Sequence, residues 1–269
     1  MLNDHDFARA LLEKALEFGA DLAGFAAVEN LKNGPSETLF PNMKDNCLER
    51  YASQVTTGLP FGSVKWEAEE KTLLVFALRH PEDKPHLDWW FGESDPPGNR
   101  ILARIASQLR DAAALLRPDV EVWLRPYAIE KGGLYLKEAA VAAGLGCIGK
   151  NNLLVTPQFG PRVRLRAIGL SLSLPQNGPS TFDPCADCSA PCRAACPREA
   201  FRKQVYTHEE TGLPALPARD GTYFRLACNG EMDENVRSIA PQRVPEYADE
   251  TIPVIRYCRA CEFACVVGK

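Results

Sequence analysis

The chain has 269 residues, of which 45% are hydrophobic and 25% are charged, which is ordinary for a soluble globular protein. This composition excludes a collagen-like, coiled-coil or intrinsically disordered chain. At roughly 150 residues per domain, the length allows one large or two unequal domains. The formal net charge of −4 excludes a protein that binds nucleic acid through its overall charge and leaves room only for a local basic patch.

The first thirty residues mix acidic, basic and apolar side chains and lack the basic start and unbroken apolar run of a secretory signal. No run of about 18 apolar residues, the length that spans a bilayer, occurs in the sequence. We therefore expect a cytoplasmic protein without a membrane partner.

Helical and strand patterns alternate along the first 175 residues. Apolar residues at helical spacing predict helices over residues 5–18 and 101–116. Apolar runs and alternating patterns predict strands over residues 21–28, 71–78, 120–124 and 162–167. These elements predict an α+β, α/β-like N-terminal domain with a central sheet, over residues 1–175. The turn-rich stretch from Leu174 to Pro184 predicts the boundary with a second domain, over residues 176–269.

Two groups of side chains in the first domain have more than one interpretation. Arg162, Arg164 and Arg166 alternate with apolar residues, which is typical of a solvated strand face and also suits an anionic ligand such as an RNA backbone. The pair Trp89 and Trp90 suits either an apolar lid over the core or a cover for a planar ligand.

Eight of the ten cysteines lie in the second domain. Because a reducing compartment disfavours structural disulfides, this crowding points to metal or catalytic chemistry. The eight are Cys185, Cys188, Cys192 and Cys196 in CADCSAPCRAACP, then Cys228, then Cys258, Cys261 and Cys265 in CRACEFAC. Cys47 and Cys147 lie outside this group and suit small buried apolar positions, so we assign them no role.

The first cysteine run follows the ferredoxin pattern C-x2-C-x2-C-x3-C-P with one extra residue, and in that pattern the fourth cysteine binds the other cluster. We therefore predict a ferredoxin-like domain with two [4Fe-4S] clusters. The cross-over predicts two ligand sets: Cys185, Cys188, Cys192 and Cys265, and Cys196, Cys228, Cys258 and Cys261.

Zinc is a second interpretation of these thiolates, and disulfides or free thiols are a third. A zinc ribbon needs two C-x2-C pairs about 15 to 20 residues apart, whereas Cys188 and Cys258 are 70 residues apart. The spacing therefore favours iron–sulfur clusters over a zinc ribbon.

A glycine-rich loop, AAGLGCIGKNN, contains Gly144, Gly146 and Gly149 in the spacing G-x-G-x-x-G. Nucleotide-binding loops of this kind need a strand before the glycines and a helix after them. Here a helix-forming run over residues 134–143 precedes the glycines, and a strand is expected over residues 152–156. The loop is therefore expected to end a helix and not to bind a nucleotide.

With the cysteine pattern, the segment KEAAVAAGLGCIGKNNLLVTPQFGPRVRL resembles the signature region of epoxyqueuosine reductases, corrinoid-dependent iron–sulfur enzymes of tRNA modification. The wider resemblance includes reductive dehalogenases, and its strong part covers residues 130–265. The resemblance implies an oxidoreductase in which an external donor of the ferredoxin or flavodoxin type reduces two [4Fe-4S] clusters. These pass electrons to a bound cobalamin and a small or nucleoside-type substrate.

The resemblance also implies roles for individual residues. Glu130 stands where the family has an aspartate that donates a proton, so it is the candidate catalytic acid, the alternative being a surface acid beside Lys131. The candidate cofactor-binding residues are Gly144, Gly146, Gly149, Lys150 and Asn151. Lys150 and Asn151 are expected either to contact the corrinoid or to cap the preceding helix. The corrinoid motif D-x-H-x-x-G is absent, which implies a cobalt site without a histidine ligand.

Three features qualify the resemblance. Cys147 and Val266 stand where the family usually has an aromatic residue and a proline. The family's C-terminal helical-repeat domain, which helps to hold tRNA, has no counterpart in this sequence, so tRNA is the less expected partner.

Two other functions remain open: an electron-transfer or reductive-activation protein that serves a partner's corrinoid, and a sensor of oxygen or iron.

Overall fold

The structure is a computed structural model that describes residues 2–40, 58–60, 62–91, 95–243 and 251–269. Its centre is a four-stranded sheet in the order β1-β2-β7-β4, in which every neighbouring pair is antiparallel. The strands are β1 (Leu22–Ala27), β2 (Thr72–Arg79), β7 (Val163–Leu170) and β4 (Val122–Leu124). The predicted mixture of helices and strands around a central sheet is confirmed.

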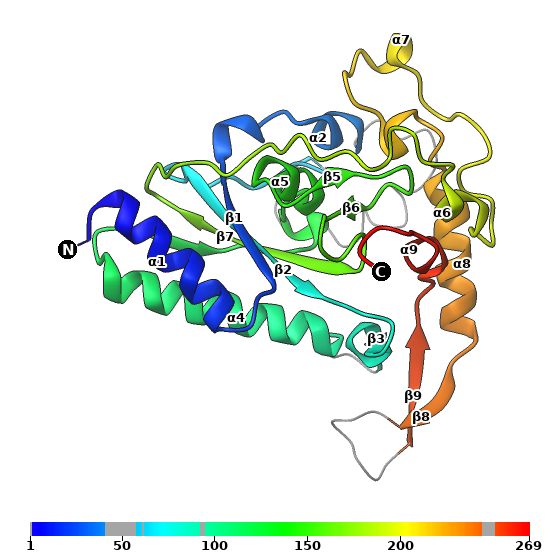
Figure 1. The fold of residues 1–269 in the computed structure, drawn as a ribbon, viewed down its shortest axis with the longest axis horizontal. Coiled ribbons are helices and arrows are strands. Elements are labelled where there is room, and N and C mark those ends of the chain that lie inside the picture. Colours follow the sequence, from blue (N-terminus) through cyan, green and yellow to red (C-terminus); the bar gives the residue numbers. More distant parts are fainter. Residues whose placement is uncertain (1, 41–57, 61, 92–94, 244–250) are drawn as a thin grey trace.

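Helices cover both faces of this sheet. On one face, α1 (Asp4–Glu17) and α4 (Pro97–Leu116) lie side by side, as Figure 1 shows. On the other face, α5 (Leu136–Ala142) packs on β1, β2 and β7. The helices expected at 5–18 and 101–116, and the strands expected at 21–28 and 71–78, are confirmed to within a few residues.

The central strand β2 contributes to both cores because its side chains alternate between the two faces. Leu74 and Phe76 pack with α1 and α4, whereas Leu73, Val75 and Ala77 pack with α5. All five side chains are fully buried. A strand buried on both faces is expected to have a continuous apolar run, and this explains why TLLVFAL is apolar throughout.

Short elements connect these parts. They are η1 (Val28–Asn30), α2 (Pro35–Leu39), η3 (Pro85–Asp88), β3 (Trp89–Trp90), η4 (Ile129–Lys131) and the hairpin of β5 (Cys147–Ile148) and β6 (Leu154–Val155). The strand expected over 152–156 corresponds to β6, and the sequence pattern did not reveal β5.

The beginning of the predicted inter-domain stretch packs on the sheet. The backbone N–H of Leu174 donates to Oγ1 of Thr72 at 3.1 Å. The side-chain oxygen of Asn177 accepts from the N–H of Phe25 at 2.7 Å. The stretch therefore continues the N-terminal fold for several residues before the cysteine-rich part begins.

The cysteine-rich part contains short helices and one hairpin. Its elements are α6 (Pro191–Ala194), α7 (His208–Thr211), η5 (Pro217–Arg219), α8 (Arg225–Arg237), β8 (Ala240–Arg243), β9 (Thr251–Arg256) and α9 (Ala260–Phe263). The sequence pattern did not reveal α8, in which the one buried residue among those described is Asn229. An apolar stripe, the usual signal of a helix, is therefore missing.

Trp89 and Trp90 join the two parts of the chain. As β3 they pair with β9, which also pairs with β8. The guanidinium of Arg256 lies 4.8 Å from the ring centre of Trp89, and both tryptophans are half-buried. The pair thus attaches the C-terminal hairpin to the N-terminal part.

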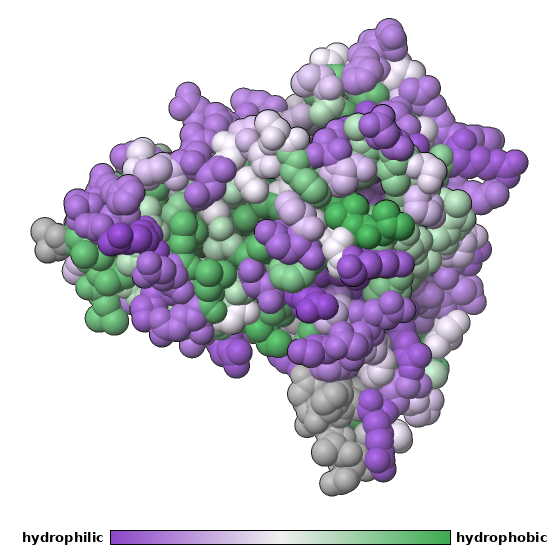
Figure 2. All heavy atoms as spheres, in the orientation of Figure 1, coloured by the Kyte–Doolittle hydropathy of each residue, from purple (hydrophilic) through white to green (hydrophobic). Residues whose placement is uncertain are grey.

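Hydrophilic side chains cover most of the face seen in Figure 2, and apolar ones form separate patches. In the described parts of the chain, no helix is both long and apolar enough to cross a membrane.

Gly24 of β1 provides a test of the packing between the sheet and α5. A Cβ at this position would clash with the carbonyl oxygen of Ala143, at the end of α5. We expect Gly24→Ala to lower the free energy of unfolding by about 1–3 kcal/mol, the usual cost of overpacking. Gly230→Ala is the control, because a Cβ at Gly230 in α8 meets no atom within 4 Å. Denaturant unfolding compares the two variants, and equal stabilities would contradict the packing described.

Candidate functional site

The structure gathers the eight cysteines of the C-terminal part into two groups. The first cysteine set, whose members line one pocket together with Lys150 and Asn151, is Cys185, Cys188, Cys192 and Cys265. The second cysteine set, linked by charge interactions that involve Cys258 and Cys261, is Cys196, Cys228, Cys258 and Cys261. The cross-over pairing names the same two groups, and the binding of a cluster by each group stays a prediction.

The two sets differ in their exposure to water. Three members of the first set, Cys185, Cys192 and Cys265, are at least 92% buried, whereas Cys258 of the second set is exposed. Burial, together with the neighbouring Cys228 and Cys258, raises the pKa of Cys261 to about 12. Cys192 of the first set also raises this pKa, so the two sets are neighbours.

Backbone N–H groups point at cysteine sulfurs in both sets. The N–H of Ala190 donates to Sγ of Cys188 at 3.4 Å, and that of Ala200 donates to Sγ of Cys196 at 3.3 Å. Such bonds stabilise negative charge on sulfur. Among the described residues, no three His, Cys, Asp or Glu side chains converge closely enough to hold a single metal ion.

The three glycines of the candidate loop are required by packing within the chain. Gly144 has a left-handed backbone (φ +75°) directly after α5, where glycine is favoured. A Cβ at Gly146 would clash with the carbonyl of Val155, and one at Gly149 would lie 2.6 Å from a methyl group of Val155. A helix precedes the glycines and the β5–β6 hairpin contains the last one, which is the opposite of the order in a nucleotide-binding loop.

Lys150 and Asn151 hold the two cysteine sets. The Lys150 ammonium donates to the carbonyl of Cys188 at 2.8 Å, and the Asn151 side-chain amide donates to the carbonyl of Cys261 at 3.4 Å. Asn151 is 3% exposed. Both side chains therefore point to the cysteine segments and not to the end of α5, so the helix-capping interpretation is wrong.

The three arginines around β7 do not form a solvated strand face. Arg162 is 7% and Arg166 is 8% exposed. The Arg162 guanidinium donates to the carbonyls of Cys265 at 3.2 Å and of Val267 at 2.5 Å. The solvated-face interpretation is wrong because an alternating pattern looks the same whether the polar face meets water or another part of the chain.

A buried ionic network joins β7 to the C-terminal cysteine segment. Arg164 pairs with Asp88 at 2.9 Å and with Glu262 at 3.2 Å, and Arg259 pairs with both carboxylates. His80 contacts Asp88 at 2.7 Å. Burial opposes ionisation of Asp88, but His80 and the two arginines outweigh it and lower the pKa of Asp88 to about 2. Burial lowers the pKa of His80, and the Asp88 carboxylate opposes this shift.

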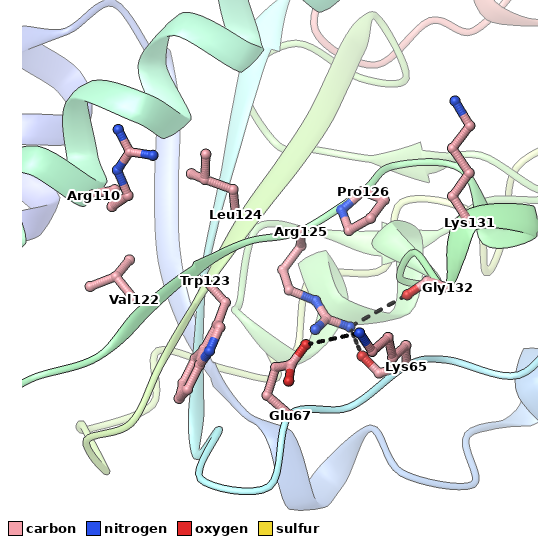
Figure 3. A pocket seen from close by; sticks show the side chains of 10 residues that line it. All are labelled: Lys65, Glu67, Arg110, Val122, Trp123, Leu124, Arg125, Pro126, Lys131 and Gly132. Atoms are coloured by element: carbon pink, nitrogen blue, oxygen red, sulfur yellow. Dashed lines mark hydrogen bonds and ion pairs between the residues drawn. The ribbon is translucent and has the colours of Figure 1, made fainter. Parts of the chain in front are cut away.

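A second pocket lies along the free edge of β4 (Figure 3). Its lining residues are Lys65, Glu67, Arg110, Val122, Trp123, Leu124, Arg125, Pro126, Lys131 and Gly132. Arg125 is held by Glu70 at 3.3 Å and by the main-chain carbonyls of Lys65 and Gly132. The sequence did not reveal this basic pocket, because its four cationic side chains come from separate segments.

Glu130 lies in η4, directly before the pocket residues Lys131 and Gly132, and its side chain is outside the described part of the structure, as is the whole of Cys47. Cys147, in β5, is half-buried, and burial and the nearby Cys185 raise its pKa to about 11.

Lys137 of α5 was not among the predicted site residues. Its ammonium donates to the carbonyl of Asn152 at 2.6 Å, and burial and Arg225 lower its pKa to about 8.

The comparisons with known proteins agree with one another. No family model matches the chain. An epoxyqueuosine reductase from Lactococcus garvieae is 23% identical over 210 residues, which are 75% of this chain and 53% of that protein. A crystal structure of epoxyqueuosine reductase with an epoxyqueuosine-modified tRNA-Tyr stem loop matches with a TM-score of 0.60 and 16% identity. This match covers 99% of this chain and 66% of that one.

The chain has the fold of the epoxyqueuosine reductases. A reductive dehalogenase structure, described as suggesting a mechanism for B12-dependent dehalogenation, shares the fold more distantly, with a TM-score of 0.50 over 74% of this chain, 26% of that chain and 17% identity. The predicted resemblance is thereby confirmed. The chain spans about half the length of the curated relative and about two thirds of the epoxyqueuosine reductase structure.

The ionic network around Asp88 predicts acid sensitivity. The folded pKa of Asp88 lies below its ordinary value of 3.8, so its ionised form stabilises the fold above that pH, and this contribution is lost as the pH falls towards 2. We expect Asp88→Asn to lower the free energy of unfolding at pH 7 by about 2 kcal/mol. The variant should also flatten the loss of stability between pH 3.8 and pH 2. Denaturant unfolding at several pH values measures both effects. If the variant lost as much stability between pH 3.8 and pH 2 as the unmodified protein, the role of Asp88 would be refuted.

Proposed function

We propose that the protein is an iron–sulfur oxidoreductase of the epoxyqueuosine reductase type. In this proposal, an external donor of the ferredoxin or flavodoxin type reduces two [4Fe-4S] clusters, which pass electrons to a bound cobalamin and a nucleoside-type substrate. The observation that carries the proposal is the gathering of eight cysteines, from segments up to 80 residues apart, into two neighbouring sets of four.

The chemistry of the two sets suits iron–sulfur clusters. Each set supplies four thiols, and Cys thiolates are the ligands that [4Fe-4S] clusters use. In both sets a backbone N–H donates a hydrogen bond to a cysteine sulfur. The side chains of Lys150 and Asn151, which are neighbours in the chain, donate to one cysteine carbonyl in each set. The proposed ferredoxin-like domain of residues 176–269 would thus hold two clusters close enough to exchange electrons without a mobile carrier.

Cobalamin is proposed from the fold relationship, since a neighbour is described as B12-dependent. When bound, it would supply a strongly reducing cobalt centre beside the substrate. The loop from Gly149 to Asn151 borders the first cysteine set, so this side of the site is the candidate contact.

Glu130 is proposed to donate the proton that accompanies substrate reduction. In the chain it directly precedes Lys131 and Gly132, which line the pocket of Figure 3. Among the cations that line that pocket, Arg125 is buried against Glu70, whereas Lys65, Arg110 and Lys131 are exposed. These three exposed cations are the candidate contacts for a polyanion such as an RNA backbone. A tRNA stem loop, the ligand of a structural neighbour, is the candidate substrate on this basis.

Metal analysis of anaerobically reconstituted protein tests the cofactor proposal. After incubation with cobalamin and gel filtration, we expect about eight irons and one cobalt per chain. Cys258→Ser should lose about half of the iron, because Cys258 belongs to one set only. Cys147→Ser, outside both sets, should keep all of it. Full iron without cobalt would favour an electron-transfer protein that serves a partner, and equal iron loss in the two variants would refute the ligand sets.

Single-turnover reduction of an epoxyqueuosine-containing stem loop tests the proposed roles of Glu130 and the basic pocket. We expect Glu130→Gln to slow the chemical step by about 100-fold or more, with unchanged RNA affinity. Arg110→Ala and Lys131→Ala should weaken RNA binding and reduce its salt dependence, because each removes a phosphate contact. Unchanged turnover in Glu130→Gln would eliminate Glu130 as the acid, and a salt-independent affinity would eliminate the pocket.

A further inference from the structure

Two cationic side chains reach the main chain of the first cysteine set from opposite ends of the 150–162 segment. Lys150, in the β5–β6 loop, donates to the carbonyls of Cys188 at 2.8 Å and of Ala186 at 3.4 Å. Arg162, just before β7, donates to the carbonyl of Cys265 at 3.2 Å. Two of the four cysteines in the set are therefore bonded to a positive charge through their own carbonyl groups.

These cations differ from the other charged groups around the site. Arg164 and Arg259 pair with the carboxylates of Asp88 and Glu262. In the described residues, by contrast, the contacts of the Lys150 and Arg162 cationic groups are main-chain carbonyls. Because Arg162 is only 7% exposed and a buried cation without a counter-ion is costly, this arrangement calls for a negatively charged group at the first cysteine set.

A reduced iron–sulfur cluster is such a group. Four thiolates give the site net negative charge, and reduction adds one electron from the external donor, which makes the charge more negative. Burial of Cys185, Cys192 and Cys265 removes the water that would stabilise the added charge. A nearby fixed positive charge then has a large effect, because interactions between charges are stronger in a low-dielectric interior.

We propose that Lys150 and Arg162 set the reduction potential of the cluster held by Cys185, Cys188, Cys192 and Cys265, by placing positive charge against the main chain of two of its ligands. This inference rests on the proposed two-cluster function and adds to it the residues that make the buried cluster reducible. Lys150 and Arg162 are positioning residues in this role, because they act on the cluster through the cysteine segments.

A purely structural role makes a different prediction. If Lys150 only holds the loops together, any substitution that loses its hydrogen bonds should lower iron content or stability and leave the potential of the cluster unchanged. If its charge sets the potential, Lys150→Met should make this cluster harder to reduce, whereas Lys150→Arg should preserve the potential. Comparison of a neutral with a cationic replacement therefore separates the two roles.

The experiment is a redox titration of the reconstituted full chain with dithionite and mediators, followed by electron paramagnetic resonance. Cys188→Ser assigns one of the two cluster signals to the first set. In Lys150→Met, we expect the ratio of reduced to oxidised first-set cluster at a fixed potential to fall about tenfold, which for a one-electron couple is a shift of 59 mV. The second-set signal should move less, because Cys258 of that set is exposed to water.

Two further comparisons complete the test. Arg162→Gln and Arg162→Lys repeat the neutral and cationic replacements at the other position, in case Lys150→Met loses iron. Lys14→Met, on α1 and paired with Glu17 at 2.6 Å, is the matched control and should not shift either signal. A first-set potential that is unchanged in the neutral variants, or equally shifted in the cationic ones, would overturn the inference. An unmodified chain that holds fewer than two clusters would instead refute the proposed function on which the inference rests.

Discussion

The attachment of the C-terminal cysteine segment to the sheet is the interaction on which the site depends. Arg162 holds the backbone after α9, and Arg164 and Arg259 share the carboxylates of Asp88 and Glu262. These contacts join the start of β7 to residues about 100 positions later in the chain, and Asp88 of η3 to Arg259, 171 positions later. Because the charges are buried, loss of one member leaves its partner uncompensated in a low-dielectric interior, which is far more costly than loss of a surface pair.

This attachment also determines how the two cysteine sets are composed. Cys265 reaches the set formed by the first cysteine run because the chain beyond α9 is hydrogen-bonded to Arg162. Cys261, one turn earlier, stays with the second set. Cys261 lies in α9 and Cys265 lies just after its end, so this short helix places one cysteine beside each set.

The glycine loop has a different role from the one its pattern suggests. Its glycines permit close contacts between α5, the β5–β6 hairpin and the stretch around Asn177. This close packing brings Lys150 and Asn151 to the cysteine segments, one side chain for each set. A loop that resembles a phosphate-binding loop in sequence therefore serves here to align two cysteine segments. The helix precedes the glycines, and its C-terminal end has the wrong polarity for an anion.

The sequence by itself determined the elements with strong periodicity. The apolar runs of β1 and β2 and the stripes of α1 and α4 identified these elements because their side chains alternate between core and surroundings at a fixed period. The cysteine spacing predicted which cysteines group together, since the pattern of the first run is local, and the ligand pairing itself stays a prediction. Only the tertiary structure decided which polar side chains are buried. The Arg162 and Arg164 contacts, the Asp88 network and the basic pocket beside η4 all join segments far apart in the chain. No local pattern reveals such contacts, because a charged side chain is the same in sequence whether it meets water, a carboxylate or the carbonyl of a distant cysteine.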